Sequence, residues 1–271
     1  MSPPAATLVD AAAILVWRDG DLRAVDEAPA GALLAADSWR VDEGRVRGYD
    51  RHWARFAGWC DDLRVDAGQL AAFRDATTAL LPRTGRWLPR VDLVGSAGGR
   101  AGASAHLLLR LRPAQPLMHE ARVRTAEPGD LRSHPRRKGP DLALLLGLRA
   151  GAIAAGADEL VLRDASGRLL EGALNSLLWW EGDALCTAPD ERTLPSVTRA
   201  LLLEIAHERG VSVRRRLPLA SELAGCEAWL ANAAHGICVV SAWGPGGPEA
   251  GPAMRAGDWR AALDATARPL P

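Results

Sequence analysis

The stretch RRKGPDLALLLGLRAGAIAAGADELVLRDASGRLLE, residues 136–171, holds the residues on which the interpretation of the whole chain depends. It contains Lys138, the only lysine in a chain that otherwise uses arginine for this kind of charge. A desolvated lysine amine can attack a carbonyl or move a proton, whereas an arginine guanidinium stays protonated. Lys138 is therefore a candidate reagent, and an ordinary surface lysine is the alternative.

The composition indicates a globular protein whose partners are small molecules. The 271 residues are 48% apolar, which allows a sizeable core, and 33 basic residues balance 33 acidic ones. This balance gives no overall field for nucleic acid or an anionic membrane. The four cysteines form no C-x-x-C pair, so we expect free thiols and no metal site. The sequence shows no signal peptide and no long apolar run, and we expect a cytoplasmic protein.

Strand and turn signals alternate with two helical segments in the N-terminal half. A strand at 12–17 continues through an Asp-Gly turn into a partner at 22–25. A helix opens at His52, and a second is expected at 67–81, where apolar residues recur on one face. The glycine-rich loop 95–102 matches no phosphate-binding motif, so a hairpin or substrate-side loop is the better interpretation.

The Pro113-Ala-Gln-Pro116 segment is stiff and polar, and it is the most natural boundary between two halves of the chain. We expect a smaller N-terminal α/β domain at 1–112, a linker at 113–120 and a larger, strand-rich C-terminal domain at 121–271. The predicted fold class is thus a two-domain α/β, or α+β, protein.

A helix is expected at 141–155, directly after the lone lysine. Pro140 suits its first turn, and the apolar face is expected from Leu142 to Leu146 and from Ile153. Lys138 would then precede the positive end of this helix, which disfavours a second positive charge and favours a neutral amine.

Five motifs follow one another from Lys138 onward. They are Lys138-x-x-Asp141, Ala157-Asp-Glu-Leu160 with Asp164 and Gly167, Glu171-Gly172 before Asn175-Ser176, Leu194-Pro-Ser-Val-Thr-Arg199 and Asn232-Ala-Ala-His-Gly236. In the N-terminal half, His52-x-x-Arg55 and Asp37-Ser38 before Arg40-Val41 add two more. In order and spacing the chain resembles the fold type IV family of pyridoxal-phosphate enzymes. That family holds branched-chain aminotransferases, D-amino-acid aminotransferases and aminodeoxychorismate lyases.

The resemblance implies roles for the cofactor-binding residues. Lys138 falls where the family has the lysine that holds pyridoxal 5'-phosphate covalently and later shuttles a proton. Glu171 falls where the family has the carboxylate that pairs with the pyridine nitrogen, which makes the ring an electron sink. Arg55 falls at the phosphate-binding arginine, and a guanidinium fork suits a phosphate dianion. Single-residue alternatives are a turn carboxylate for Glu171 and a surface helix charge for Arg55.

Two further segments are expected at the cofactor phosphate. Val197 and Thr198 match a loop that donates backbone amides and a hydroxyl at a helix start, where unpaired amides favour an anion. Ala233, with Asn232 beside it, matches the second amide-donating segment.

Three departures from the family pattern bear on the reaction. Leu142 stands where aminotransferases of the family usually carry a tyrosine, four residues after the lysine, and Asn175-Ser176 reverses the family's Ser-Asn pair. Ser38 lies where aminodeoxychorismate lyases have a threonine, so its hydroxyl is expected to protonate the departing pyruvate enol.

The resemblance favours a lyase that eliminates pyruvate from 4-amino-4-deoxychorismate to give 4-aminobenzoate. Compact length, the Asn232-Ala233-Ala234 segment and the Gly98-Gly-Arg100 loop lean toward this branch. One alternative is an aminotransferase acting on branched-chain or D-amino acids with a 2-oxo acid acceptor, for which Arg100 and His235 are candidate carboxylate contacts. Another is an inactive relative that acts as a binding protein. The family also implies a homodimer.

Overall fold

The computed structural model describes residues 12–95 and 105–271, and these form two compact units. The first unit contains the described part of residues 1–116 together with Arg137–Pro140 and Ala267–Pro271. The second contains Leu117–Arg136 and Asp141–Thr266. The chain passes from one unit to the other between Pro116 and Leu117, inside the expected linker. The segment that carries Lys138 returns to the first unit.

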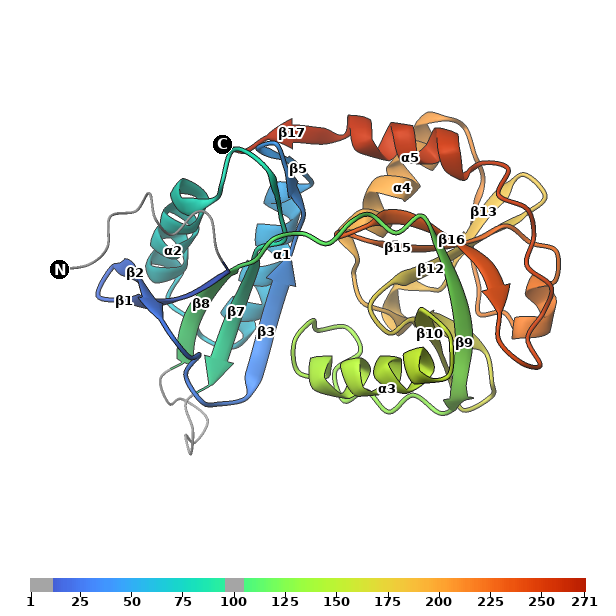
Figure 1. Cartoon of the computed structure of the whole chain (residues 1–271), viewed down its shortest axis with the longest axis horizontal. Coiled ribbons are helices and arrows are strands. Elements are labelled where there is room, and N and C mark those ends of the chain that lie inside the picture. The colour runs from blue at the N-terminus through green and yellow to red at the C-terminus, as the bar shows by residue number, and fades with distance from the viewer. Residues whose placement is uncertain (1–11, 96–104) are drawn as a thin grey trace. The chain divides into compact units, whose positions relative to one another are not determined.

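An antiparallel five-stranded sheet forms the centre of the first unit (Figure 1). Its strands, in spatial order, are β2 (Asp21–Val25), β1 (Ala13–Arg18), β8 (Ala105–Leu111), β7 (Arg90–Gly95) and β3 (Leu33–Ser38). The Asp-Gly turn joins β1 to β2 as predicted, with Arg18 opposite Asp21. At the other edge, Ser38 lies opposite Arg90, and Arg90 lies opposite Arg110.

Two helices pack against this sheet, and a smaller sheet completes the unit. Helix α1 (Tyr49–Asp62) contacts β3, and α2 (Ala67–Leu80) contacts β2. Asp66 caps α2 by accepting a hydrogen bond from the Gln69 amide at 2.7 Å. The smaller antiparallel sheet has the order β17 (Ala267–Pro269), β5 (Arg45–Arg47), β4 (Val41–Asp42) and β6 (Arg86–Trp87).

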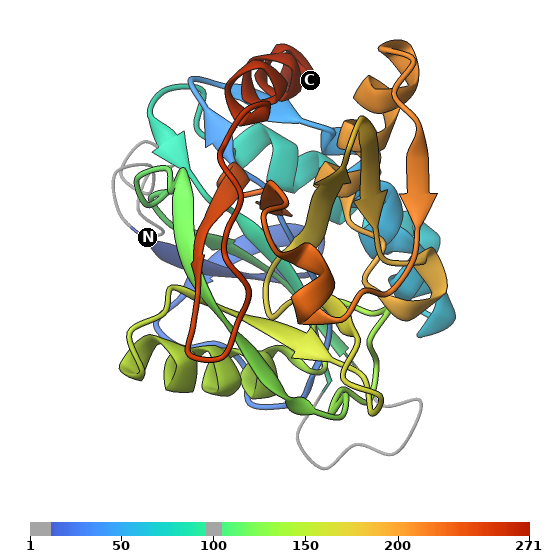
Figure 2. The ribbon, with the colours of Figure 1, turned by 90° about the vertical axis from the view of Figure 1, so that its right-hand side faces the viewer.

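The second unit is built on a mixed eight-stranded sheet. Its strands, in spatial order, are β11 (Leu169–Gly172), β10 (Glu159–Arg163), β9 (Glu120–Pro128), β16 (Gly236–Trp243), β15 (Ala228–Asn232), β12 (Ser176–Glu181), β13 (Ala184–Thr187) and β14 (Val213–Arg215). The pairs β9–β10, β9–β16 and β13–β14 are parallel. Figure 2 shows β9 and β16 side by side. Several strands are buried on both faces, as the continuous burial of β12 and β13 shows.

Three α-helices contact this sheet, and two 3₁₀ turns lie in the same unit. They are α3 (Leu142–Ala154), α4 (Val197–Glu208), α5 (Ala256–Ala265), η2 (Asp190–Arg192) and η3 (Ala220–Leu223). A core joins α4 and α5 to β12 and β15 through Trp180, Trp229 and Trp259, whose ring centroids lie 5.3–5.6 Å apart. Such edge and tilted pairs suit the quadrupoles of aromatic rings.

The apolar face of α3 differs from the expected one. Leu146 and Ile153 are both 47% exposed, while Leu145, Leu148 and Ala152 contact the cluster around β10. The expectation for Leu146 and Ile153 was wrong because the helix is apolar nearly all round. In such a helix the sequence does not say which stripe faces the sheet.

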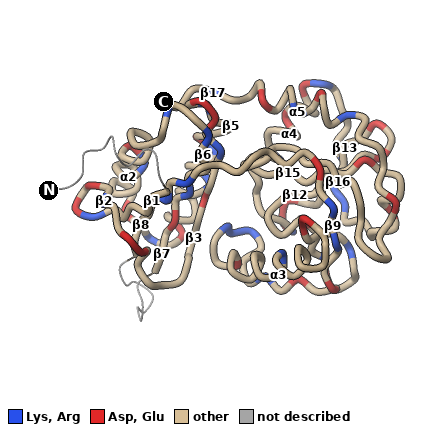
Figure 3. The backbone as a smooth tube through the Cα atoms, in the orientation of Figure 1, with Lys and Arg blue, Asp and Glu red and all other residues tan. Residues whose placement is uncertain are grey.

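The distribution of charged residues and the state of the cysteines agree with what the composition predicts for a globular protein. Figure 3 shows basic and acidic residues interspersed along both units. The four cysteines are free thiols, of which Cys226 is the least buried. In the part of the chain that the structure describes, no helix is long and apolar enough to cross a membrane. The expected loop at 95–102, including Gly98 and Arg100, lies outside the described residues apart from Gly95.

Candidate active site

Lys138 is bound to the edge strand β3 of the first unit. Its carbonyl oxygen accepts a hydrogen bond from the Ala36 amide at 2.7 Å. Gly139, the next residue, has φ +133°, and a Cβ there would lie 2.9 Å from the backbone of Ala35. Only glycine combines this conformation with so close an approach. The glycine thus lets the lysine segment lie against the strand.

The Lys138 amine contacts Ser38, another of the residues that the sequence singled out. Its Nζ donates a hydrogen bond to the Ser38 Oγ at 2.9 Å. Burial lowers the pKa of Lys138 to about 8; Asp37 opposes this effect, and Arg55, Arg90 and Arg112 add to it. A neutral amine was predicted from the helix start. In the structure the main cause is burial, assisted by arginines of the first unit.

Asp37, next to Ser38, organises a buried polar group. Its carboxylate is fully buried and contacts His52 Nδ1 at 2.8 Å. It also accepts hydrogen bonds from Arg55 Nε at 2.7 Å and Nη2 at 2.8 Å. Although burial raises it, the pKa of Asp37 is held well below its usual range by Arg55 and His52. The His52-x-x-Arg55 motif on α1 is therefore fixed to β3 by one carboxylate.

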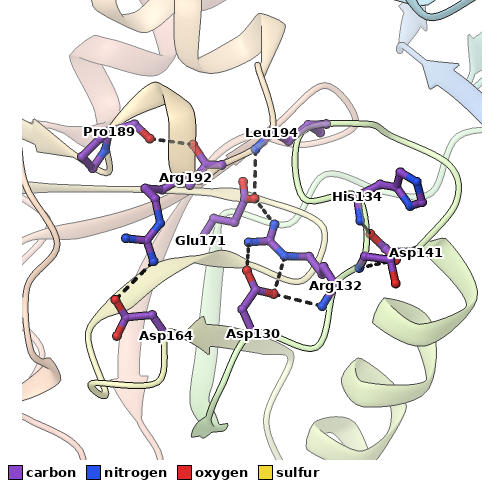
Figure 4. Close-up of polar contacts among 11 residues, drawn as sticks. Asp130, Arg132, His134, Asp141, Asp164, Glu171, Pro189, Arg192 and Leu194 are labelled. Carbon is purple, nitrogen blue, oxygen red and sulfur yellow. Dashed lines mark hydrogen bonds and ion pairs between the residues drawn. The ribbon is translucent and has the colours of Figure 1, made fainter.

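Glu171 lies on β11 of the second unit, and one of its oxygens accepts all the hydrogen bonds that described residues donate to it (Figure 4). Oε1 accepts from Arg132 Nη1 and from the Leu194 amide, the latter at 3.0 Å. No described residue donates to Oε2. Burial raises the pKa of Glu171 to about 7, against the opposing effects of Arg132, the Leu194 amide and Arg199. The carboxylate is thus oriented by protein groups with one oxygen left for another donor.

Arg132 is held in turn by Asp130. Its Nε and Nη2 donate to the two oxygens of Asp130, each at 2.8 Å, and its side chain is 4% exposed. Asp141 fixes the loop that follows Arg132, because its carboxylate accepts hydrogen bonds from the amides of Ser133 and His134 at 3.0 and 2.7 Å. The polar segment before Lys138 therefore has a defined conformation.

The loop that supplies the Leu194 amide is fixed by Arg199. This buried guanidinium donates to Thr193 Oγ1 at 2.6 Å and to Asp190 Oδ1 at 2.9 Å. Arg199 was quoted only as part of a motif, and the structure gives it a positioning contact.

Val197 and Thr198 occupy the first turn of α4, as predicted. Ser196 is the N-cap and accepts from the Arg199 amide at 3.2 Å. No described residue accepts a hydrogen bond from the amides of Val197 and Thr198. Unpaired amides at a helix start favour an anion.

A buried relay of side chains leads to the Asn232 turn. Arg149 Nε lies 3.3 Å from Glu159, Asn175 donates to Glu159, and Asn232 Nδ2 donates to Asn175 Oδ1 at 2.7 Å. Asn232 Oδ1 accepts from the Ala234 and His235 amides at 3.0 and 2.8 Å. The reversed Asn175-Ser176 pair thus places Asn175 in this relay and leaves the Ser176 hydroxyl buried without a partner among described residues.

The predicted residues fall into two groups, one in each unit. Lys138, Ser38 and Arg55 belong to the first unit, and Glu171, Val197, Thr198, Asn232 and Ala233 belong to the second. Of the two suggested carboxylate contacts, His235 uses Nδ1 to accept from the Met118 amide at 3.2 Å. Asp37 was named only within the Asp37-Ser38 motif, without a role. Gly139 and Arg132 were not predicted, and the sequence signals for them were the glycine after the lysine and the Asp-x-Arg pair.

The chain belongs to the amino-transferase class IV family, whose sequence model matches residues 34–243. The family and fold type IV predictions are therefore confirmed, as is pyridoxal phosphate as the cofactor of this family. No curated protein matches the chain significantly.

Solved structures share the fold at low sequence identity. A hypothetical aminotransferase from Mycobacterium tuberculosis has a TM-score of 0.78 at 16% identity, covering 94% of this chain and 98% of that one. The branched-chain aminotransferase of the thermophilic archaeon Thermoproteus uzoniensis has 0.78 at 18%, covering 96% and 100%. A Legionella pneumophila protein provisionally assigned as a 4-amino-4-deoxychorismate lyase has 0.73 at 16%, covering 89% and 97%. At these identities the likeness concerns the fold.

The residues present fit pyridoxal phosphate. A half-buried amine with a lowered pKa suits covalent attachment to an aldehyde. The open Oε2 of Glu171 suits a protonated ring nitrogen, and the unpaired amides at the start of α4 suit a phosphate.

Proposed function

We propose that this chain is a pyridoxal-phosphate-dependent lyase that releases pyruvate from 4-amino-4-deoxychorismate and forms 4-aminobenzoate. The observation that carries the proposal is the 2.9 Å hydrogen bond between Lys138 Nζ and Ser38 Oγ. Elimination of pyruvate requires a base that removes one proton and an acid that delivers one to the leaving group. An amine and a hydroxyl in direct contact supply both.

The bound cofactor, held by Lys138, would act as the electron sink for the carbanion formed at the amine-bearing carbon. Once the substrate amine has displaced Lys138 from the cofactor, the freed Lys138 Nζ removes the proton from the amine-bearing ring carbon. The Ser38 hydroxyl donates a proton to the enolpyruvyl group as the bond between the ether oxygen of that group and the ring carbon breaks. Lys138 then returns the abstracted proton to Ser38 through their hydrogen bond. The proton lost by the ring thus replaces the one that Ser38 gives to pyruvate, so the proton count balances, and the ring becomes aromatic.

The remaining predicted residues bind and orient the cofactor in this proposal. Glu171 keeps a proton at the ring nitrogen through its open Oε2. Arg55, fixed by Asp37, and the amides of Val197 and Thr198 bind the phosphate, with Asn232 and Ala233 as the second amide segment.

The reaction is tested by supplying 4-amino-4-deoxychorismate and measuring pyruvate and 4-aminobenzoate together. We expect equal amounts of both from the wild type. Ser38→Ala should lower kcat by about 100-fold, because general acid catalysis typically contributes 10²–10⁴, while Ser38→Thr keeps the hydroxyl and most of the activity. Equal activity of the alanine and threonine variants would remove Ser38 from the mechanism.

The same assay separates the lyase from the aminotransferase alternative, which the family name favours. Amino-group transfer from a branched-chain or D-amino acid to a 2-oxo acid, without pyruvate from 4-amino-4-deoxychorismate, would overturn the lyase assignment. Failure to take up cofactor would support the inactive binding protein instead. We further propose that the protein is a homodimer, which chromatography with light scattering would test. We also propose that it is cytoplasmic.

A further inference from the structure

Three arginines lie together on the sheet of the first unit, next to the Lys138–Ser38 pair. Arg90 is directly opposite Ser38 on one neighbouring strand and Arg110 on the other. The side chains of Ser38, Arg90 and Arg110 therefore project from the same face of the sheet. Arg112 follows two residues after Arg110, and Arg90, Asp92 and Arg110 all influence its pKa, which burial lowers. Apart from the effect of Arg90 and Arg112 on the pKa of Lys138, these arginines have no role in the proposed function.

Backbone and carboxylate contacts orient the cluster. Asp92 is fully buried and accepts from Arg90 Nη2 at 2.8 Å and from Arg110 Nε at 2.7 Å. Arg112 Nε donates to the Leu88 carbonyl at 3.0 Å. Among the described residues, nothing accepts from Nη1 or Nη2 of Arg112. A guanidinium anchored through Nε with both terminal nitrogens open presents the edge that binds a carboxylate with two hydrogen bonds.

The cluster also has more cations than anions. The Asp92 carboxylate pairs with Arg90 and Arg110 but not with Arg112, and all three arginines are half-buried. Arg90 and Arg112 are close enough to the Lys138 amine to help lower its pKa. Unbalanced charge of one sign in a partly desolvated place is costly unless an anion is bound there. Arg55 and the helix start serve the cofactor phosphate in the proposal above, so the cluster is available for a different anion.

We propose that Arg112, supported by Arg90, binds a carboxylate group of the substrate amine, so that this enzyme acts on carboxylate-bearing amines and discriminates against neutral ones. The inference rests on the proposed function, since it places the substrate beside the reactive lysine. Arg90 and Arg110, both tied to Asp92, keep the region positive, and Arg112 provides the two-pronged contact. This site fills the role for which Arg100 and His235 were the only candidates in the sequence.

The test compares two probes by calorimetry: 4-aminobenzoate, which carries the carboxylate, and aniline, which lacks it. Binding is measured with and without pyridoxal phosphate, for the wild type and for Arg112→Met, Arg112→Lys and Arg23→Met. Arg23 is a matched control because it lies on β2 of the same sheet and its side chain is 55% exposed. Thermal unfolding of each variant shows whether it is folded.

We expect Arg112→Met to weaken 4-aminobenzoate binding by about 10- to 100-fold, the usual range for a charge-assisted contact. Arg112→Lys should lose less, because it keeps the charge but not the fork. Aniline binding, cofactor uptake and the Arg23→Met variant should be unchanged.

Three results would overturn the inference: unchanged 4-aminobenzoate affinity in Arg112→Met, equal losses for both probes, or a loss confined to pyridoxal phosphate. The last would assign Arg112 to the cofactor phosphate. A wild type that takes up no cofactor would sink the proposed function alone. The difference between the two probes in cofactor-free protein would still decide whether Arg112 binds a carboxylate.

Discussion

At the scale of single residues, the proposed function makes cofactor uptake depend on the ionisation of Lys138. The amine attacks an aldehyde only when neutral, and burial lowers its pKa from 10.5 to about 8. The rate of cofactor uptake by cofactor-free protein should therefore rise with pH up to about 8 and level off by about pH 9. Stopped-flow absorbance from pH 6 to 10.5 measures this profile.

The arginines make that profile a test of the electrostatics as well. Arg112 is one of the cations that lower the pKa of Lys138, so Arg112→Met should move the midpoint to higher pH, while Arg23→Met should leave it in place. A wild-type rate that still climbs between pH 9 and 10.5 would mean that the amine titrates like an ordinary exposed lysine.

Arg132 governs the charge of Glu171. Burial raises the pKa of Glu171 to about 7, and Arg132 is the largest influence against this rise. In Arg132→Met the pKa should rise further, so that the carboxyl is protonated at pH 7 and no longer stabilises a protonated ring nitrogen. Cofactor affinity at pH 7 should then fall by about 10- to 100-fold, the usual range for a hydrogen bond to a charged group, and recover partly at pH 9.

The matched control for Arg132 is Arg192→Met. Arg192 lies in the same unit and pairs with Asp164 at 3.3 Å, but its side chain is 45% exposed and it does not contact Glu171. Fluorescence titration with pyridoxal phosphate at both pH values distinguishes the two variants. Equal affinities at pH 7 for the wild type and Arg132→Met would remove Arg132 from the control of Glu171.

At the scale of elements, the close approach of Gly139 to β3 determines where the lysine lies. In Gly139→Ala a Cβ would meet the Ala35 backbone at 2.9 Å, and φ +133° is strained for any side chain. The strain, of order 1–3 kcal/mol, should lower the unfolding temperature. Displacement of Lys138 should slow cofactor uptake by at least about 10-fold, because a near-attack geometry is lost.

Gly151→Ala controls for the loss of a glycine in general. Gly151 is in α3, where an added Cβ meets nothing within 4 Å, so the variant should be as stable as the wild type or more stable by up to about 1 kcal/mol. If Gly139→Ala took up cofactor as fast as Gly151→Ala, the approach to β3 would not position the lysine.

Elements with a clear local pattern could be predicted from the sequence. The Asp-Gly turn after β1 and the helix beginning at Val197 rest on local chemistry and were found where expected. The buried stripe of α3 could not be predicted, because apolar residues surround that helix and only tertiary packing selects a face.

Site residues could be proposed from the sequence only where they belong to a motif. Lys138 and Glu171 were proposed through their motifs, and their roles stay predictions. Some contacts depend on strand register or on loops distant in sequence and appear only in the fold: those of Asp92 with Arg110, of Arg112 with Leu88 and of Arg132 with Glu171. Sequence spacing alone does not tell an arginine that binds a substrate from one that is merely exposed.

At the scale of the whole molecule, the compact units are not contiguous in sequence. Arg137–Pro140 leaves the second unit's chain to join the first, and so does Ala267–Pro271, where β17 pairs with β5. Composition can suggest that the chain divides at a linker. It cannot show that a short segment joins the other unit, because that depends on backbone hydrogen bonds such as the one between Ala36 and Lys138. Lys138 therefore belongs to the first unit, whereas the chain on either side of Arg137–Pro140 belongs to the second.

The whole chain should be stabilised by pyridoxal phosphate, because a ligand that binds only the folded state raises the free energy of unfolding by RT ln(1 + [L]/Kd). At a hundredfold excess over Kd the gain is about 2.7 kcal/mol, which corresponds to a rise of roughly 5 to 10 °C in the unfolding temperature for a chain of this size. Scanning calorimetry with and without the cofactor measures the rise, and pyridoxine, which has no aldehyde and no phosphate, is the control ligand. Lys138→Met should keep part of the rise, since in the proposed function the phosphate contacts do not depend on the lysine. If the rise in Lys138→Met equalled that of the wild type, the covalent bond would contribute nothing to binding. If the wild type showed no rise, the chain would not bind the cofactor of its family.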